Sequence, residues 1–153
     1  MWDLFTERAR HVIYGTEKEA ASMRQSSITP EHLLLALTRE PGSMAERLLT
    51  GMGVTLEEIR GAIEHEAERG NAGQTAPGPG TRFTMSPHGK RVLDKAFEQH
   101  KSLGDSYLGT EHLLLGIIAD REGLAARVLT DRGVDLEYAR RTEELLRKSA
   151  DRL

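Results

Sequence analysis

Two glutamates and two hydroxyl residues stand where the sequence predicts that helices begin. Thr6 and Ser86 are predicted hydroxyl N-caps, and Glu31 and Glu111 fall in the first turn of later helices. The unpaired amides of a helix N-terminus bind anions, and a carboxylate beside them would favour a guanidinium. Together they would suit a ligand that carries both charges. The alternative is that each glutamate only complements the helix dipole, which contributes about 0.3–1 kcal/mol.

The histidines do not predict a catalytic or metal site. His32 and His112 each follow a glutamate directly, so the two side chains of each pair point about 100° apart on a helix. This differs from the His-Glu-x-x-His spacing that places two imidazoles on one face. We interpret these histidines as surface or capping residues.

Known catalytic signatures are missing from the sequence. It contains no cysteine, which excludes thiolate zinc sites and cysteine nucleophiles. It also contains no Gly-x-Ser-x-Gly elbow, no phosphate-binding loop and no dinucleotide fingerprint. We therefore expect a protein that is not an enzyme and that uses no cofactor and no metal ion.

The elements that position the glutamates and hydroxyls occur twice in the chain. Residues 28–60 and 108–140 align at an offset of 80 with 14 identities in 33 positions. Ordinary residue usage would give about two by chance, so the repeat is real. We expect two tandem four-helix repeats in a pseudo-twofold arrangement, and thus eight helices in one compact all-α domain. The boundaries predicted are repeat 1 at residues 1–69, a flexible linker at 70–82 and repeat 2 at 83–153.

The same helix-start signals recur in the same order in both repeats. The predicted helices of repeat 1 begin at Thr6, at Thr29 with Pro30 in the first helical position, near Met44 and near Leu56. Those of repeat 2 begin at Ser86, Thr110, Leu124 and Leu136. Two leucine triplets, at residues 33–35 and 113–115, are predicted to lie in the core.

Composition and charge narrow the classes of partner. With 24 acidic and 21 basic residues in 153, the formal charge is −3 and the basic residues are scattered, which argues against nucleic acid. No apolar run approaches the roughly 20 residues of a membrane helix, and the N-terminus is too polar for a signal peptide. We expect a cytoplasmic protein without nucleic-acid or membrane partners.

Three stretches of the sequence resemble a known family. They are Trp-Asp-Leu-Phe-Thr-Glu-Arg-Ala-Arg-His-Val-Ile at residues 2–13, the repeated Glu-His-Leu-Leu-Leu, and Phe-Thr-x-Ser-Pro at residues 83–87. Together they resemble the N-terminal repeat domain of Clp ATPases, most of all the ClpC type. The resemblance implies a domain that recruits substrates and adaptor proteins to an unfoldase that feeds the ClpP protease. In the ClpC branch it also implies recognition of phosphorylated arginine and of cyclic-peptide antibiotics such as cyclomarin.

The resemblance assigns roles to individual residues. Glu31 and Glu111 match the family's guanidinium-binding glutamates, and Thr6 and Ser86 match its phosphate-side hydroxyls. Basic residues flank these positions, and they are Arg10 and Lys90 in this sequence.

Two aromatic residues match positions that the antibiotic contacts in the family. They are Trp2, where phenylalanine is typical, and Phe83. Another departure is Thr29-Pro30 in the first repeat, where the family pattern has Gly-Thr. Proline removes an amide from the first turn, but that amide has no partner within a helix in any case.

The resemblance leaves two functions open. The first is a non-enzymatic binding module for phosphoarginine-tagged proteins, adaptors or domain-targeting antibiotics. By sequestering such antibiotics, the module would have a role in resistance. The second is a regulatory adaptor that docks on the Clp unfoldase and modulates its activity. The chain stops before the ATPase modules of a ClpC protein, and we expect a free-standing paralogue rather than an excised domain.

Overall fold

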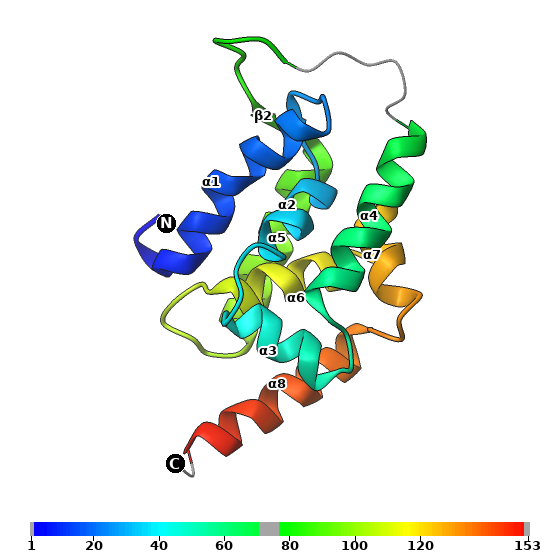
Figure 1. Cartoon of the computed structure of the whole chain (residues 1–153). Helices are drawn as coiled ribbons and strands as arrows, with labels where there is room; N and C mark the ends of the chain where they lie inside the picture. Colours follow the sequence, from blue (N-terminus) through cyan, green and yellow to red (C-terminus); the bar gives the residue numbers. More distant parts are fainter. Residues whose placement is uncertain (1, 71–76, 152–153) are drawn as a thin grey trace.

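The computed structural model describes residues 2–70 and 77–151, which are mostly helical (Figure 1). The elements of the first repeat are η1 (Trp2–Leu4), α1 (Glu7–Ser22), β1 (Ser27–Ile28), α2 (Pro30–Leu37), α3 (Met44–Gly51) and α4 (Leu56–Gly70). Those of the second are β2 (Thr84–Met85), α5 (Pro87–Ser102), α6 (Thr110–Asp120), α7 (Gly123–Thr130) and α8 (Leu136–Asp151). These eight α-helices of the described residues confirm the predicted fold. Residues 71–76 of the predicted linker lie outside the described residues.

The two repeats exchange equivalent contacts, which confirms the predicted pseudo-twofold arrangement. Ile28 of β1 pairs in parallel with Met85 of β2. At the offset of 80, Leu108 pairs in parallel with Phe5. The helices follow the same rule, because α3 packs on α6 and α8 while α7 packs on α2 and α4. Each repeat therefore completes the packing of the other.

The helix starts form as the sequence predicts. The Thr6 hydroxyl accepts a hydrogen bond from the Ala9 amide over 3.1 Å, and the Ser86 hydroxyl accepts one from the Gly89 amide over 2.9 Å. His32 and His112 act as caps, because the Nδ1 atom of each accepts a hydrogen bond from the backbone amide three residues earlier. Of the two roles predicted for these histidines, surface or capping residue, the structure shows capping, because both side chains are buried.

Helix α6 lies in the middle of the molecule, where it contacts helices of both repeats. Its residues from Thr110 to Ile118 are all buried. The leucine triplets at 33–35 and 113–115 are buried as well, which confirms their predicted place in the core. Within the described residues, no helix combines the length and apolarity that crossing a membrane requires.

A buried carboxylate ties α1 to the other helices of its repeat. Glu19 is 2% exposed, and its Oε1 atom accepts a hydrogen bond from Arg60 over 2.7 Å and another from Arg39. Burial alone would raise the pKa of Glu19, but the hydrogen bonds from the two arginines outweigh it and lower that pKa. The equivalent position holds the neutral Gln99, which accepts a hydrogen bond from Arg140 over 3.4 Å.

Substitution at the α5–α6 contact tests how closely these helices pack. A Cβ atom at residue 116 would lie 2.7 Å from the Val92 carbonyl oxygen and 2.8 Å from the Ala96 amide nitrogen. These are backbone atoms, so we expect Gly116→Ala to lower the free energy of unfolding by about 1–3 kcal/mol in urea titrations followed by circular dichroism.

The matched control is Gly15→Ala in α1. A Cβ atom at Gly15 would lie 3.6 Å from the Ala36 Cβ atom, which is an ordinary contact. Because alanine favours a helix interior over glycine, this variant should be neutral or more stable by up to about 1 kcal/mol. Equal stability of the two variants would contradict the close approach of α5 and α6.

Candidate functional site

Each predicted hydroxyl cap lies beside the glutamate segment of the other repeat. The Thr6 amide donates to the Leu108 carbonyl over 3.0 Å, three residues before Glu111. The Ser86 amide donates to the Ile28 carbonyl over 2.8 Å, three residues before Glu31. The sequence shows one cap and one glutamate in each repeat, whereas the structure pairs them across repeats. We call these places the Thr6–Glu111 site and the Ser86–Glu31 site.

In the Thr6–Glu111 site the carboxylate is enclosed. The Glu111 side chain is 2% exposed, and its Oε2 atom accepts a hydrogen bond from the Tyr107 hydroxyl over 3.2 Å. Burial and the charge of Glu111 raise the pKa of Tyr107 to about 12, so the phenol stays protonated at neutral pH. Tyr107 was not among the site residues predicted from the sequence. A comparison of the two repeats at the positions where they differ would have found it, because Ser27 is its counterpart.

Ionic contacts behind Glu111 hold the segment that precedes α6. The Nε2 atom of buried His112 contacts Asp105 at 2.6 Å, and Arg147 donates to the same carboxylate at 2.7 Å. Burial alone would raise the pKa of Asp105, but the bonds from Arg147 and His112 outweigh it and lower that pKa. In the first repeat the Nε2 atom of His32 is buried without a hydrogen-bond partner among the described residues. Within the part of the chain that the structure describes, the second repeat alone therefore has this ionic support.

In the Ser86–Glu31 site the carboxylate is half-buried and stands near an imidazole. A Cβ atom at Gly123 would lie 2.9 Å from Cε1 of His88 and 3.9 Å from Oε1 of Glu31. Gly123 has a φ of 84°, a left-handed conformation that favours glycine. His88 and Glu31 thus flank one stretch of glycine backbone, close to the N-terminus of α5. His88 was not among the site residues predicted from the sequence.

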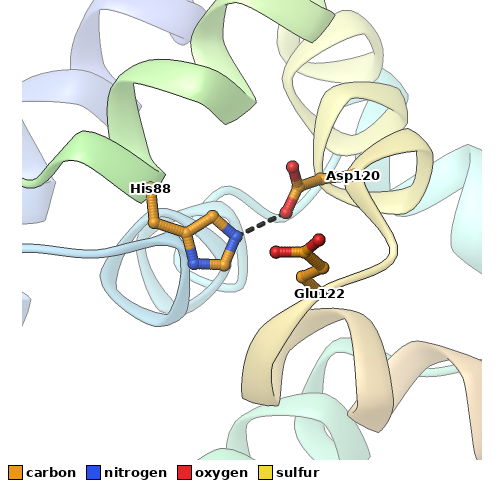
Figure 2. A group of neighbouring side chains, drawn as sticks. All are labelled: His88, Asp120 and Glu122. Carbon is orange, nitrogen blue, oxygen red and sulfur yellow. Dashed lines mark hydrogen bonds and ion pairs between the residues drawn. The ribbon is translucent and has the colours of Figure 1, made fainter.

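His88 also belongs to a group of charged side chains, shown in Figure 2. Ligand atoms of His88, Asp120 and Glu122 lie within 4.8 Å of one another, a spacing that could hold a cation. However, Arg91 already donates to Asp120 Oδ1 over 2.7 Å and to Glu122 Oε2 over 2.7 Å. The Arg91 guanidinium is already paired with both carboxylates, so the donor set fits an ion-pair network better than a metal centre.

The first repeat contains the equivalent network. Glu40, the counterpart of Asp120, contacts Arg8 and His11 of α1. Arginine and histidine have exchanged positions between the repeats, because His88 aligns with Arg8 and Arg91 with His11. A carboxylate held by one arginine and one histidine therefore joins the first two helices of each repeat.

The flanking basic residues differ in their environments. The Arg10 guanidinium lies 5.7 Å from the Trp2 ring centroid, and its Nη2 atom donates to the Trp2 carbonyl over 3.2 Å. Lys90, its counterpart, is exposed. Trp2 thus holds Arg10, whereas Lys90 is exposed in the first turns of α5.

The two predicted aromatic contact residues lie at different sites. Trp2 is 39% exposed, four residues before Thr6, and its ring centroid is 5.7 Å from that of Tyr14, which is 67% exposed. Phe83 is half-buried, three residues before Ser86. An exposed aromatic surface therefore lies at the Thr6 end of the molecule.

Removing the charge of Asp120, labelled in Figure 2, tests the ion-pair interpretation. The Asp120 side chain is 1% exposed, so Asp120→Asn should lower the free energy of unfolding by about 1–3 kcal/mol at pH 7. The matched control is Glu122→Gln, whose side chain is 70% exposed and which should change stability by no more than about 0.5 kcal/mol.

The effect of Asp120→Asn should also depend on pH. Burial alone would raise the pKa of Asp120, but bonds from Arg91 and His88 outweigh it and lower that pKa. The stabilisation is therefore present above the unfolded pKa of about 3.9 and is lost as the pH falls through the folded value. Urea titrations at pH 7 and pH 3 should show the gap between wild type and variant closing. A gap that stays constant would contradict the network.

Comparison with known proteins gives consistent matches over nearly the whole chain. The family model described as "Clp repeat (R) N-terminal domain" matches residues 4–149. The negative regulator of genetic competence ClpC/MecB of Bacillus subtilis is 38% identical over 141 residues, which are 92% of this chain and 16% of the relative. The chaperone protein ClpB of Oceanobacillus iheyensis is 36% identical over 140 residues, 92% of this chain and 17% of the relative.

The fold is similar to solved structures of the same kind. The crystal structure of the N-terminal domain of the chaperone ClpD from Arabidopsis thaliana is 27% identical, with a TM-score of 0.71 and coverage of 97% of each chain. The chain spans about a sixth of the length of the curated relatives it matches.

Proposed function

The chain belongs to the Clp N-terminal repeat domain family, and from this premise we propose that it is a non-enzymatic module that binds phosphoarginine-tagged proteins in the cytoplasm. The supporting observation is that a hydroxyl-capped helix N-terminus adjoins a glutamate segment at two places in the fold. The amides would bind the phosphoryl group, and the carboxylate would bind the guanidinium.

The chemistry of each half supports this division of roles. The Thr6 and Ser86 hydroxyl oxygens accept amides of their own helices, so each hydroxyl proton remains available to an anion. First-turn amides lack acceptors within the helix, which leaves those of Glu7 and Arg8 directed toward a ligand. A planar guanidinium can in turn donate two parallel hydrogen bonds to one carboxylate. A ligand with both groups would satisfy the two halves together.

The exposed aromatic surface extends the proposal to peptide ligands. Trp2 and Tyr14 offer ring faces next to Arg10, and large rigid aromatics contribute much of the contact area in peptide recognition. We propose that adaptors or cyclic-peptide antibiotics contact this surface, with Phe83 at the other site. A protein that bound such antibiotics without unfolding substrates would sequester them.

A regulatory adaptor is the second candidate function. Tyr138 and Leu145 are 36% and 64% exposed and lie seven residues apart on α8, an element that carries none of the four site residues. They could dock on an unfoldase independently of the anion sites. Such an adaptor would change the ATPase rate of the unfoldase equally well with or without Glu31 and Glu111.

Neutralising the two site glutamates tests the proposed function. Calorimetric titration with phosphoarginine should give binding to wild type at millimolar ligand or better. Because both carboxylates lose their charge, the Glu31→Gln, Glu111→Gln double variant should bind at least about tenfold more weakly. Free phosphate and free arginine, which each carry half of the ligand, should bind more weakly than phosphoarginine.

The matched control is the Glu57→Gln, Glu137→Gln double variant. These glutamates are exposed, lie in the first turns of α4 and α8, and are related by the same offset. Their replacement changes the charge equally and should leave binding intact. Absence of phosphoarginine binding to wild type, or equal binding by both double variants, would overturn the proposal.

A further inference from the structure

We propose that the two sites are unequal because the Tyr107 hydroxyl takes the place of a guanidinium at Glu111, so that the Ser86–Glu31 site binds first. This inference rests on the proposed function. At Glu111 the carboxylate is enclosed and hydrogen-bonded to Tyr107 over 3.2 Å. At Glu31 the carboxylate is half-buried, and no side chain of the described residues donates to it.

The surroundings hold Tyr107 in this position. Its ring lies against His112 with centroids 5.3 Å apart, and its carbonyl contacts His100 Nδ1 at 3.1 Å. The next amide, of Leu108, donates to the Leu4 carbonyl over 2.8 Å. Asp105 on the other side is fixed by Arg147. Leu108, which follows Tyr107, and Asp105, two residues before it, are thus both anchored, and the Tyr107 hydroxyl is held against Glu111.

Among the described residues, the first repeat offers no equivalent of the Tyr107 hydroxyl. The counterpart of Tyr107 is Ser27, an exposed residue of β1 whose backbone pairs with Thr84. The serine side chain has only two heavy atoms, so it cannot take the place that the Tyr107 phenol takes at Glu111. An incoming guanidinium therefore meets an unoccupied carboxylate at Glu31, and at Glu111 it must first displace the Tyr107 hydroxyl.

The helix N-termini that would bind the phosphoryl group, which we call the anion halves of the sites, also differ. Here the Thr6–Glu111 site is the more favourable one. Pro87 occupies the first position of α5 and has no N–H, so this end offers the His88 amide alone after Ser86 has taken that of Gly89. The first turn of α1 keeps the amides of Glu7 and Arg8. The Thr6–Glu111 site thus has the stronger anion half but a blocked cation half.

Single-site variants separate the two sites in calorimetric titrations with phosphoarginine. Glu111→Gln leaves only the Ser86–Glu31 site intact, and Glu31→Gln leaves only the Thr6–Glu111 site intact. We expect Glu31→Gln to weaken binding more than Glu111→Gln does. Adding Tyr107→Phe to Glu31→Gln should strengthen binding about three- to tenfold, because one hydrogen bond no longer competes.

Two controls show that the gain arises at Glu111. Tyr107→Phe combined with Glu111→Gln should bind as Glu111→Gln alone does, because the phenol faces only the disabled site. Tyr138→Phe, an exposed tyrosine on α8, should have no effect in either background.

The outcomes distinguish this inference from the proposed function. If Glu31→Gln binds equally with and without Tyr107→Phe, or binds better than Glu111→Gln, the inference is wrong while the proposed function stands. If wild type binds no phosphoarginine, both are wrong. Circular dichroism of each variant checks that its helices are intact.

Discussion

The fold depends on the main-chain hydrogen bonds that join the two repeats. Thr6 bonds to the segment before α6, and Ser86 bonds to the segment before α2. These amides precede helices α1 and α5, so each bond fixes where the first helix of one repeat begins against the second helix of the other. The bonds also satisfy backbone groups that helices α1 and α5 leave without partners of their own. This one constraint makes both candidate sites composite.

Charged side chains then attach the helices to the shared core. Because α6 is buried along most of its length, its ends need polar partners, and His112 and Asp120 provide them. Buried carboxylates are tolerated where arginines neutralise them, as at Glu19 and Asp120. The repeats reach this balance with different residues: Glu19 and two arginines in one, and Gln99 with Arg140 in the other.

Sequence reasoning predicted the local features because their signals are local. Thr6 and Ser86 precede helices at fixed spacings, and the leucine triplets follow the pattern of buried helix faces. The pairing of each cap with the glutamate segment of the other repeat could not be predicted from the sequence. The same segments could form the same hydrogen bonds within one repeat. The Tyr107 contact was also missed, because it joins an extended segment to the first turn of α6 and follows no helical spacing. The two ion-pair networks escaped notice because arginine and histidine had exchanged places.

Composite sites change what divergence between the repeats does. If each site lay within one repeat, substitutions in the second repeat would alter one site alone. Here Pro87 and Tyr107 both belong to the second repeat, yet Pro87 removes an amide from the Ser86–Glu31 site and Tyr107 covers the carboxylate of the Thr6–Glu111 site. Two substitutions in one copy therefore reach the anion half of one site and the cation half of the other. Tandem duplication with exchanged contacts lets such a protein give its two sites different binding properties while both keep the same backbone frame.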